Sequence, residues 1–496
     1  MQMRRVGKAL IAGLLVAAMV WAGAALEQAK AQGQSSVPLA PAVREFVKED
    51  APVVALKSVR LIDGTGAAAR ENQTIVFGDG KITAVGDAAG TAIPAGAKVL
   101  DFAGKDYTVI PGIVGMHDHM YYPAPNGPPA MYPEHATSFP RLYLAAGVTT
   151  IRTTGSVETY TDLELKRQID AGRMVGPKMF VTGPYLEGVG SFTPQMHELK
   201  DAADARSTVE FWISQGVTSF KAYMHISAEE LSAAVKAAHA RGIKVTGHLC
   251  SIGFREAAAI GMDDLEHGLV VDTEFFSGKK PGECPNAQAA AREMAEKLDV
   301  ASVPVAEMIR DLVAHKVAVT STLPVFEAFV PSRPPLERRV LDAMTPDARI
   351  AYLRSRAGIA DNAARSYWPA LLRKEMEFER AFVKAGGLLL AGLDPTGNGA
   401  VIAGFGDQRE VELLVETGFT ATEAIQIATS NGAQFLGESK RIGTLAVGKA
   451  ADVVVIKGNP AANIADIKNV EMVFKDGVGY DSAKLIESVK GLVGLR

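Results

Sequence analysis

The chain has 496 residues, of which 48% are hydrophobic and 22% are charged, so its composition is that of a globular protein with a large core. The formal net charge is -4, and no run of Lys and Arg is interleaved with aromatic residues, so we expect no nucleic-acid partner. The two cysteines, Cys250 and Cys284, provide no disulfide framework. They can form one bond in an oxidising compartment or remain two unpaired thiols.

Residues 1–31 have the pattern of a signal peptide. Three basic residues precede an apolar run, which is followed by an Ala-Lys-Ala cleavage site at 29–31. The alternative is an uncleaved membrane anchor, because the run is near the lower limit for spanning a bilayer. We predict cleavage, a periplasmic or secreted mature protein, and no membrane span after cleavage.

Short strand-like runs separated by turn residues occur near both ends of the chain. After a polar and loosely ordered lead at 32–52, such runs occupy 55–62 and 74–77, and they return at 442–445, 451–456 and 470–474. We therefore predict a small composite β-sandwich domain built from 53–110 and 436–480. Residues 481–496 are interpreted as a C-terminal tail.

Between these ends, apolar β-branched runs alternate with helical patterns, which is typical of a parallel α/β fold. The eight candidate strands are 108–119, 148–153, 178–182, 218–223, 244–248, 264–267, 317–322 and 388–394. Ser227 and Glu230 have the spacing of a capping box that opens one of the helices. We predict a (β/α)8 TIM barrel over 111–435, whose catalytic residues lie at the carboxyl ends of the strands. Residues 324–387 are too many for a simple connection, so we interpret them as a helical insertion.

Histidines and one aspartate stand at the ends of several candidate strands. His117 and His119 are one residue apart, so in a strand both imidazoles face the same side. A pair of hydrogen-bonded histidines is the alternative for that motif alone. His248, His267 and Asp394 end other strands of the same barrel, and strand ends converge at its mouth. Imidazole and carboxylate are ligands of zinc and similar ions, so the pattern indicates a metal centre.

Lys221 is the unusual residue of an otherwise apolar strand. A lysine that points into a barrel mouth loses its hydration, and burial lowers its pKa. The neutral amine can then combine with carbon dioxide, and the resulting carbamate has two oxygens that can bridge two cations. An ordinary salt bridge to a neighbouring carboxylate is the alternative.

Taken together, these residues resemble the amidohydrolase superfamily, and most closely its imidazolonepropionase-like and prolidase-like branch. The resemblance covers roughly 53–480, including the Gly448-Lys449-Ala450-Ala451-Asp452 segment. It implies two divalent metal ions, with zinc expected, a CO2-derived carbamate on Lys221, and the six ligands His117, His119, Lys221, His248, His267 and Asp394. Asp394 is followed by Pro395-Thr396-Gly397-Asn398, which departs from the small-residue turn of many members, so substrate specificity is not carried over.

The chemistry expected of such a centre is hydrolysis. Two cations roughly 3.5 to 4 Å apart lower the pKa of a bridging water, so that a hydroxide exists at neutral pH. Asp394 would accept the proton and pass it to the leaving amine, and Tyr223 would donate a hydrogen bond to the oxyanion, unless it only packs beside the metals. His197 is a further catalytic candidate, while Tyr122 and His225 are candidates for substrate binding. Solvated loop residues or packing residues are the alternative for these three.

The sequence thus predicts a secreted or periplasmic hydrolase of amide or peptide C–N bonds, acting on a dipeptide or an N-acyl amino acid. Hydrolysis of a lactone or phosphotriester at the same centre is an alternative, because the same hydroxide attacks carbon or phosphorus. A non-catalytic binding protein on this scaffold is a third reading, which predicts lost ligands, and none is missing. The expected partner is a small molecule or short peptide, and a homo-oligomer is compatible with the sequence.

Overall fold

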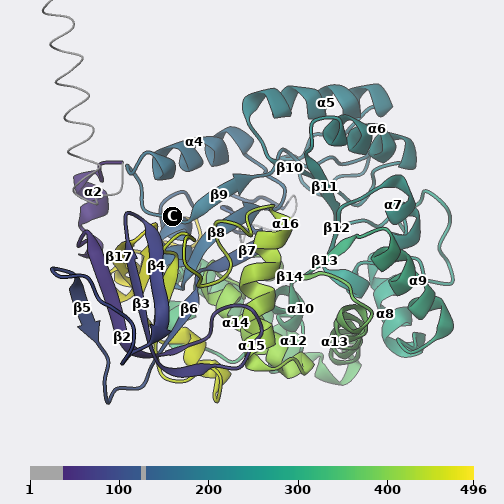
Figure 1. Cartoon of the computed structure of the whole chain (residues 1–496). Helices are drawn as coiled ribbons and strands as arrows, with labels where there is room; N and C mark the ends of the chain where they lie inside the picture. Colours follow the sequence, from purple (N-terminus) through teal and green to yellow (C-terminus); the bar gives the residue numbers. More distant parts are fainter. Residues whose placement is uncertain (1–36, 125–129, 496) are drawn as a thin grey trace, which may run out of the picture.

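The computed structural model describes residues 37–124 and 130–495 (Figure 1). The predicted signal peptide lies outside these residues. Within the described part of the chain, no helix is both long and apolar enough to cross a membrane.

Eight parallel strands form the centre of the molecule. Their bounds are β7 Ile113–Asp118, β8 Val148–Thr153, β9 Lys178–Val181, β10 Ser219–Ala222, β11 Lys244–Gly247, β12 Asp264–Glu266, β13 Ala318–Ser321 and β14 Leu389–Ala391. Strands β7 to β9 form one sheet and β10 to β14 another, each in chain order. Parallel bridges from Thr182 to Ser219 and from Leu186 to Ala222 link the end of β9 and the loop after it to β10. Near the other edges of the two sheets, the Asp394 N–H donates to the His117 carbonyl at 3.0 Å. The prediction of a parallel α/β fold is confirmed.

The first predicted strand, 108–119, is two strands in the structure. β6 (Tyr107–Pro111) pairs antiparallel with β15 (Val453–Lys457), whereas β7 pairs parallel with β8. The break falls at Gly112, where an added Cβ would lie 2.0 Å from the Thr149 hydroxyl oxygen. A single extended run is therefore divided between two sheets, and the residue at the break is a glycine because the chain passes too close to its neighbour there for any side chain.

Strands from both ends of the chain form one nine-stranded sheet, drawn in purple and yellow in Figure 1. Besides β6 and β15 it contains β1 Val47–Glu49, β2 Val53–Leu61, β3 Arg70–Gly78, β4 Lys81–Asp87, β5 Lys98–Asp101, β16 Val470–Lys475 and β17 Val478–Asp481. β3 and β16 are four positions apart in this sheet, yet the rings of Phe77 and Phe474 are 4.8 Å apart. The sheet therefore curls over a small apolar core of its own.

Two segments differ from the sequence-based expectation. The lead contains an ordered strand, β1, which pairs with β17, and the expected strand at 442–445 is absent. Leu445 instead donates its backbone N–H to the Asp63 carbonyl at 2.9 Å, outside any ladder. Alternation alone did not distinguish a short extended loop from a strand.

Helices cover the outer side of the parallel strands (Figure 1). Those that follow strands β7 to β12 are α3 Ser138–Ala145, α4 Thr159–Asp170, α5 Ala202–Gln215, α6 Ala228–His239, α7 Phe254–Ile260, η1 Gly268–Val270, α8 Ala287–Lys297 and α9 Val303–Ala314. The predicted capping box of α6 is present, since the Ser227 hydroxyl accepts the Glu230 N–H at 3.2 Å and the Glu230 carboxylate accepts the Ser227 N–H at 2.9 Å.

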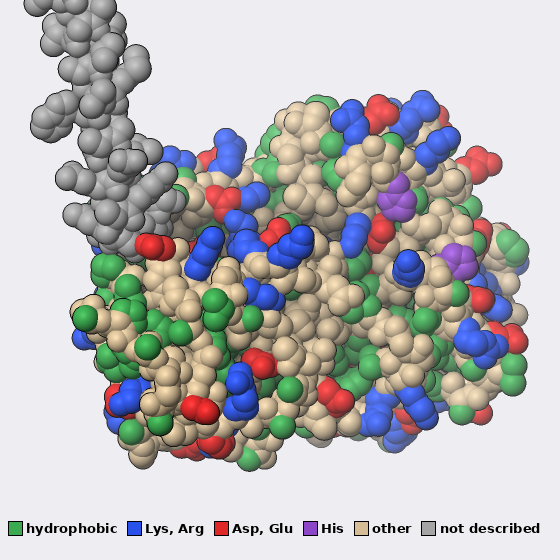
Figure 2. Space-filling view, viewed as in Figure 1, with side chains coloured by type: hydrophobic (Ala, Val, Ile, Leu, Met, Phe, Trp, Pro, Cys, Tyr) green, Lys and Arg blue, Asp and Glu red, His purple; other side chains and the backbone are tan. Residues whose placement is uncertain are grey.

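The long segment before β14 is helical, as predicted. It contains α10 Leu323–Glu327, α11 Arg338–Ala343, α12 Pro346–Asp361, η2 Ala363–Arg365 and α13 Trp368–Lys384. The remaining helical segments are α2 Pro41–Arg44, α14 Phe405–Thr417, α15 Ala421–Gln426, η3 Ile427–Asn431, α16 Gly432–Phe435, η4 Ile464–Lys468 and α17 Ser482–Glu487. On the face shown in Figure 2, basic and acidic side chains are interspersed.

Candidate metal centre

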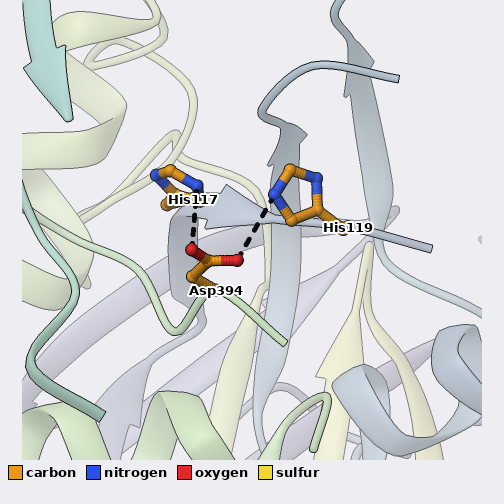
Figure 3. A group of neighbouring side chains, drawn as sticks. All are labelled: His117, His119 and Asp394. Atoms are coloured by element: carbon orange, nitrogen blue, oxygen red, sulfur yellow. Dashed lines mark ion pairs between the residues drawn. The ribbon is translucent and has the colours of Figure 1, made fainter. Parts of the chain in front are cut away.

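A buried group of histidines and one aspartate lies at the carboxyl ends of the parallel strands. Candidate ligand atoms of His117, His119 and Asp394 all lie within 4.8 Å of one another (Figure 3). The Asp394 carboxylate is 3.8 Å from His117 Nε2, 3.6 Å from His119 Nε2 and 3.9 Å from His267 Nε2. Three imidazoles from two sequence-distant strand ends thus present the same nitrogen to one carboxylate.

The opposite nitrogen of each of these imidazoles is held by a protein acceptor. His117 Nδ1 lies 2.7 Å from Glu266 Oε2, His119 Nδ1 lies 3.2 Å from the Gly155 carbonyl, and His267 Nδ1 lies 2.7 Å from the Thr322 hydroxyl. A donor role for Nδ1 leaves Nε2 with its lone pair free, which is the arrangement that orients histidines around a metal. His267 Nε2 is buried and has no hydrogen-bond partner within the described residues. These observations fit a divalent cation.

Burial keeps the histidines neutral. It lowers the pKa of His117, His119 and His267 well below the usual value, and the nearby Lys221 charge acts in the same direction. For His248, burial and Lys221 lower the pKa to about 3. The His248 ring lies 4.6 Å from that of His267, at the side of the group. Neutral imidazoles are the form that binds a cation, so the pocket favours ligands over protonated histidines.

Lys221 on β10 points into this group. Its side chain is fully buried, and Nζ is 3.1 Å from His117 Nε2. Burial lowers the pKa of the amine to about 8, although the carboxylates of Glu266 and Asp394 oppose that shift. Within the described residues no ion pair joins Lys221 to a carboxylate, so the simple salt bridge considered from the sequence is not formed.

A buried ionic network beneath the histidines was missed by the sequence reasoning. Arg152 on β8 donates to Glu266 at 2.8 Å, to Asp264 at 3.1 Å and to the Met116 carbonyl at 2.6 Å. Burial opposes ionisation of Glu266, but the charges of Arg152 and Lys221 lower its pKa below the usual value. The signal for this network was an arginine inside an apolar strand, since a fully buried arginine requires carboxylate or carbonyl partners.

Aromatic residues close the space above the ligands. A cavity of about 140 Å³ is lined by His119, Lys221, His248, His267 and Asp394 and by the phenols of Tyr121, Tyr132, Tyr185 and Tyr223. Tyr121 stacks on His119 at 4.4 Å and shares a short hydrogen bond with Tyr185. Burial raises the pKa of Tyr223 well above its usual value, so this phenol stays protonated and able to donate.

Three predicted residues are not brought to this cavity. Tyr122, one position after Tyr121, points into the core and donates to the Gly399 carbonyl at 2.5 Å. His197 is 54% exposed and lies 3.3 Å from Asp204, whereas its neighbour Met196 lines the cavity. His225 turns toward Glu187, with Nδ1 3.5 Å from the carboxylate. The alternation of side chains and the loop conformations direct these groups elsewhere, so the structure does not bring them together with the candidate ligands.

Two of the candidate ligands have a backbone conformation that is uncommon for residues other than glycine. His267 has φ +70° and Asp394 has φ +51°, both in the left-handed region. Such conformations store strain and concentrate at functional sites. His267 directly follows β12, and Asp394 lies three residues after the end of β14.

Parallel strands whose carboxyl ends gather buried histidines and a carboxylate define an α/β protein with a candidate metal-binding site. Residues 108–479 match the amidohydrolase family, and the chain belongs to that family. It is therefore a hydrolase that acts on C–N bonds in a family that depends on metal, which confirms the predicted enzyme class.

Solved structures with the same fold include a putative prolidase from Bifidobacterium longum, at 24% identity and a TM-score of 0.62, with 88% of this chain and 98% of that chain covered. A Xaa-Pro dipeptidase with bound methionine in its active site is similar at 21% identity and a TM-score of 0.64, covering 86% of this chain and 100% of that one. The ochratoxinase of A. niger is similar at 19% identity and a TM-score of 0.62, covering 90% and 100%. A comparison with curated protein sequences found no match.

Proposed function

We propose that this protein is a secreted or periplasmic amidohydrolase of the imidazolonepropionase-like and prolidase-like branch. Its substrate is a dipeptide or an N-acyl amino acid, and it binds two divalent cations, zinc being the expected metal. The observation that carries the proposal is the convergence of three Nε2 atoms and the Asp394 carboxylate on one buried point beside Lys221. The names of the prolidase and dipeptidase structures with this fold support the choice of an amide bond.

The residues that would hold the cations are His117, His119, Lys221, His248, His267 and Asp394. When bound, the cations supply Lewis-acid activation of a water and of the scissile carbonyl. Lys221 contributes as a carbamate: its neutral amine adds to carbon dioxide and releases one proton, which leaves an anion with two oxygens. The buried amine with a pKa lowered to about 8 and the missing carboxylate partner support this modification.

Asp394 and Tyr223 are the chain's own reacting groups in this proposal. We propose that the Asp394 carboxylate takes a proton from the attacking water and returns it to the leaving amine. Without bound cations, burial raises the pKa of this carboxyl to about 6. Tyr223 lies in the same cavity as Asp394, and its protonated phenol would donate to the carbonyl oxygen as negative charge develops there.

We further propose that the two parallel sheets close as a (β/α)8 barrel and that the nine-stranded sheet folds into a sandwich. The Thr182–Ser219 bridge and the bond from Asp394 to the His117 carbonyl support closure on both sides. In the other domain, neighbouring strands are about 4.8 Å apart, so a flat sheet would separate β3 and β16 by roughly 19 Å. The contact between Phe77 and Phe474 requires the sheet to fold over.

Export of the protein is supported by its cysteines. Cys250 and Cys284 form a disulfide with Cα atoms 4.8 Å apart, and such bonds persist in oxidising compartments. The apolar run and cleavage pattern in residues 1–31 indicate that a cleaved signal peptide directs the export. Amino-terminal sequencing of protein recovered from the periplasm or medium tests cleavage after the residue at position 31.

Metal analysis tests the centre directly. After reconstitution with Zn²⁺ and ¹³C-bicarbonate, the mature protein should hold about two metal ions per chain and show a carbamate carbon resonance by NMR. Lys221→Ala should lose the resonance and the metal, whereas the exposed Lys236→Ala should keep both. About one metal or none in the wild type, or a Lys221→Ala variant with unchanged metal content and turnover, would refute the binuclear proposal.

A substrate panel then tests the bond that is cleaved. Dipeptides, N-acyl amino acids, lactones and phosphotriesters are compared by kcat/KM with the same reconstituted protein. Preference for the amides is the expected result. Faster turnover of a lactone or phosphotriester would transfer the assignment to that bond type while leaving the metal centre intact.

A further inference from the structure

A second cavity adjoins the metal centre. Its volume is about 190 Å³, and it shares His248 and Phe326 with the cavity that contains the candidate ligands. We call it the Trp368 cavity. Its other walls come from the loop after β10, from η1, from α8 and from the start of α13, through Met224, Val270, Ala290, Ala291, Met294 and Trp368.

An aromatic wall leads from the metal centre into the Trp368 cavity. The Phe326 ring lies 5.7 Å from that of His267 and is stacked with the Trp368 ring at 6.1 Å and 17°. Trp368 also stacks with Phe329 at 4.8 Å and with Tyr367 at 5.4 Å. The helical insertion therefore supplies a flat apolar surface that begins beside a candidate ligand.

The opposite wall is tied in place by covalent and polar bonds. The Cys250–Cys284 disulfide joins the loop after His248 to the segment that leads into α8. Lys279 Nζ donates to the carbonyls of Cys250 at 2.5 Å and Ser251 at 2.7 Å, and the Thr273 hydroxyl donates to the Cys250 carbonyl at 2.7 Å. These bonds shape the cavity before a ligand arrives, which lowers the entropic cost of binding.

Little in the cavity favours a charged ligand. Asp272 is the one carboxylate among its described lining residues. Its Oδ1 accepts the Glu274 backbone N–H at 3.0 Å, and its Oδ2 is covered by protein atoms. A charged group moved from water into this space would lose its hydration without gaining a partner, whereas an apolar group would gain contacts with the rings.

We propose that the Trp368 cavity is the subsite for an apolar side chain of about the size of benzene, carried by the substrate on one side of the scissile amide. The inference rests on the proposed amide hydrolysis. Its volume supports the size, because a cavity of about 150 Å³ lined by apolar residues accommodates benzene. Because His248 and Phe326 line both cavities, such a side chain would lie next to the cavity that contains the candidate ligands.

Two matched substrate series test the proposal. N-acetylphenylalanine against N-acetylalanine varies the amine side of the bond, and phenylacetylglycine against acetylglycine varies the acyl side. In one series the aromatic member should have the higher kcat/KM by at least roughly 10-fold, because a single methylene in an apolar pocket already changes kcat/KM by about 10- to 200-fold. Equal kcat/KM within both series would overturn the proposal.

A filled cavity provides the second test. Ala291→Phe places a ring in the cavity and should remove the preference by lowering kcat/KM for the aromatic substrate about 10-fold or more, with the small substrate changed less than about twofold. The matched control is Ala289→Phe, on the exposed face of the same helix and outside the cavity lining. A preference that survives Ala291→Phe would refute the assignment.

A binding measurement separates failure of this proposal from failure of the proposed function. Saturation-transfer NMR with benzyl alcohol should detect bound ring protons in the wild type and in Ala289→Phe, but not in Ala291→Phe, with 1-propanol giving no signal. If benzyl alcohol binds in this way but no amide is cleaved, the apolar binding site is supported and the proposed amide hydrolysis is refuted. Absence of benzyl alcohol binding, or binding that Ala291→Phe leaves unchanged, would overturn the subsite itself.

Discussion

Replacing Glu266 by glutamine changes one oxygen to an amide at the point where two buried side chains meet. Glu266 accepts from His117 at 2.7 Å through Oε2 and from Arg152 at 2.8 Å through Oε1. A glutamine keeps the shape but has only one acceptor, so one of the two donors faces an NH2 group. The charged guanidinium of Arg152 holds the amide oxygen more strongly than a neutral imidazole does, so the NH2 group faces His117, which loses the partner that keeps Nε2 directed at the centre.

The expected loss follows from the role of such supporting groups. Mutation of a residue that orients a metal-binding histidine weakens metal affinity or activity by about 10- to 100-fold, which corresponds to roughly 1.4 to 2.7 kcal/mol. The fold should persist, because Arg152 keeps its bonds to Asp264 at 3.1 Å and to the Met116 carbonyl at 2.6 Å. Zinc affinity measured by competition with a chelating dye tests the loss, with circular dichroism as the check on folding.

Asp264→Asn is the matched control. Asp264 is buried on the same strand and contacts the same arginine, but no bond joins it to a histidine among the described residues. Burial and the Glu266 charge raise its pKa to about 8, so near pH 7 it is largely a neutral carboxyl that asparagine imitates. Glu266→Gln with unchanged zinc affinity, or Asp264→Asn with an equal loss, would refute the reasoning.

Three further outcomes are expected. Tyr223→Phe should lower kcat about 10²- to 10³-fold at unchanged metal content, as loss of one oxyanion donor does, and an unchanged kcat would make Tyr223 a packing residue. Burial raises the pKa of Glu379 to about 8, so the folded state binds a proton that the unfolded state releases above about 4.3. The free energy of unfolding should therefore fall as pH rises from about 4.3 to about 8, by at most ~1.4 kcal/mol per pH unit. Chemical denaturation at several pH values measures this dependence. It should be weaker in Glu379→Gln than in the wild type and unchanged in the exposed Glu377→Gln. Reduction of the Cys250–Cys284 bond, which closes a loop of 34 residues, should cost ~3–4 kcal/mol and lower the melting temperature, while Cys284→Ser should melt at the same temperature with and without reductant.

Local pattern was sufficient for most of the elements. The strand near 219–222 and the capped helix after it were predictable because strand alternation, helix periodicity and a Ser-x-x-Glu cap are properties of neighbouring residues. The same local rules failed at Gly112, because the run pairs with β15 before this glycine and with β8 after it, and neither partner is visible in the local pattern. They also failed at the lead, whose strand exists because β17 pairs with it.

For the site, the sequence by itself determined which side chains end strands, and strand order in a parallel fold implied that His117, His119, His267 and Asp394 would meet. Only the tertiary structure decided what surrounds them. Glu266 can orient His117 because Arg152, on another strand, holds its carboxylate in place. Tyr121 rather than Tyr122 lines the cavity. The Trp368 cavity arises from segments that the sequence keeps far apart. Periodicity records the neighbours of a residue along the chain, whereas the direction of a side chain and the identity of its contacts depend on packing between distant elements.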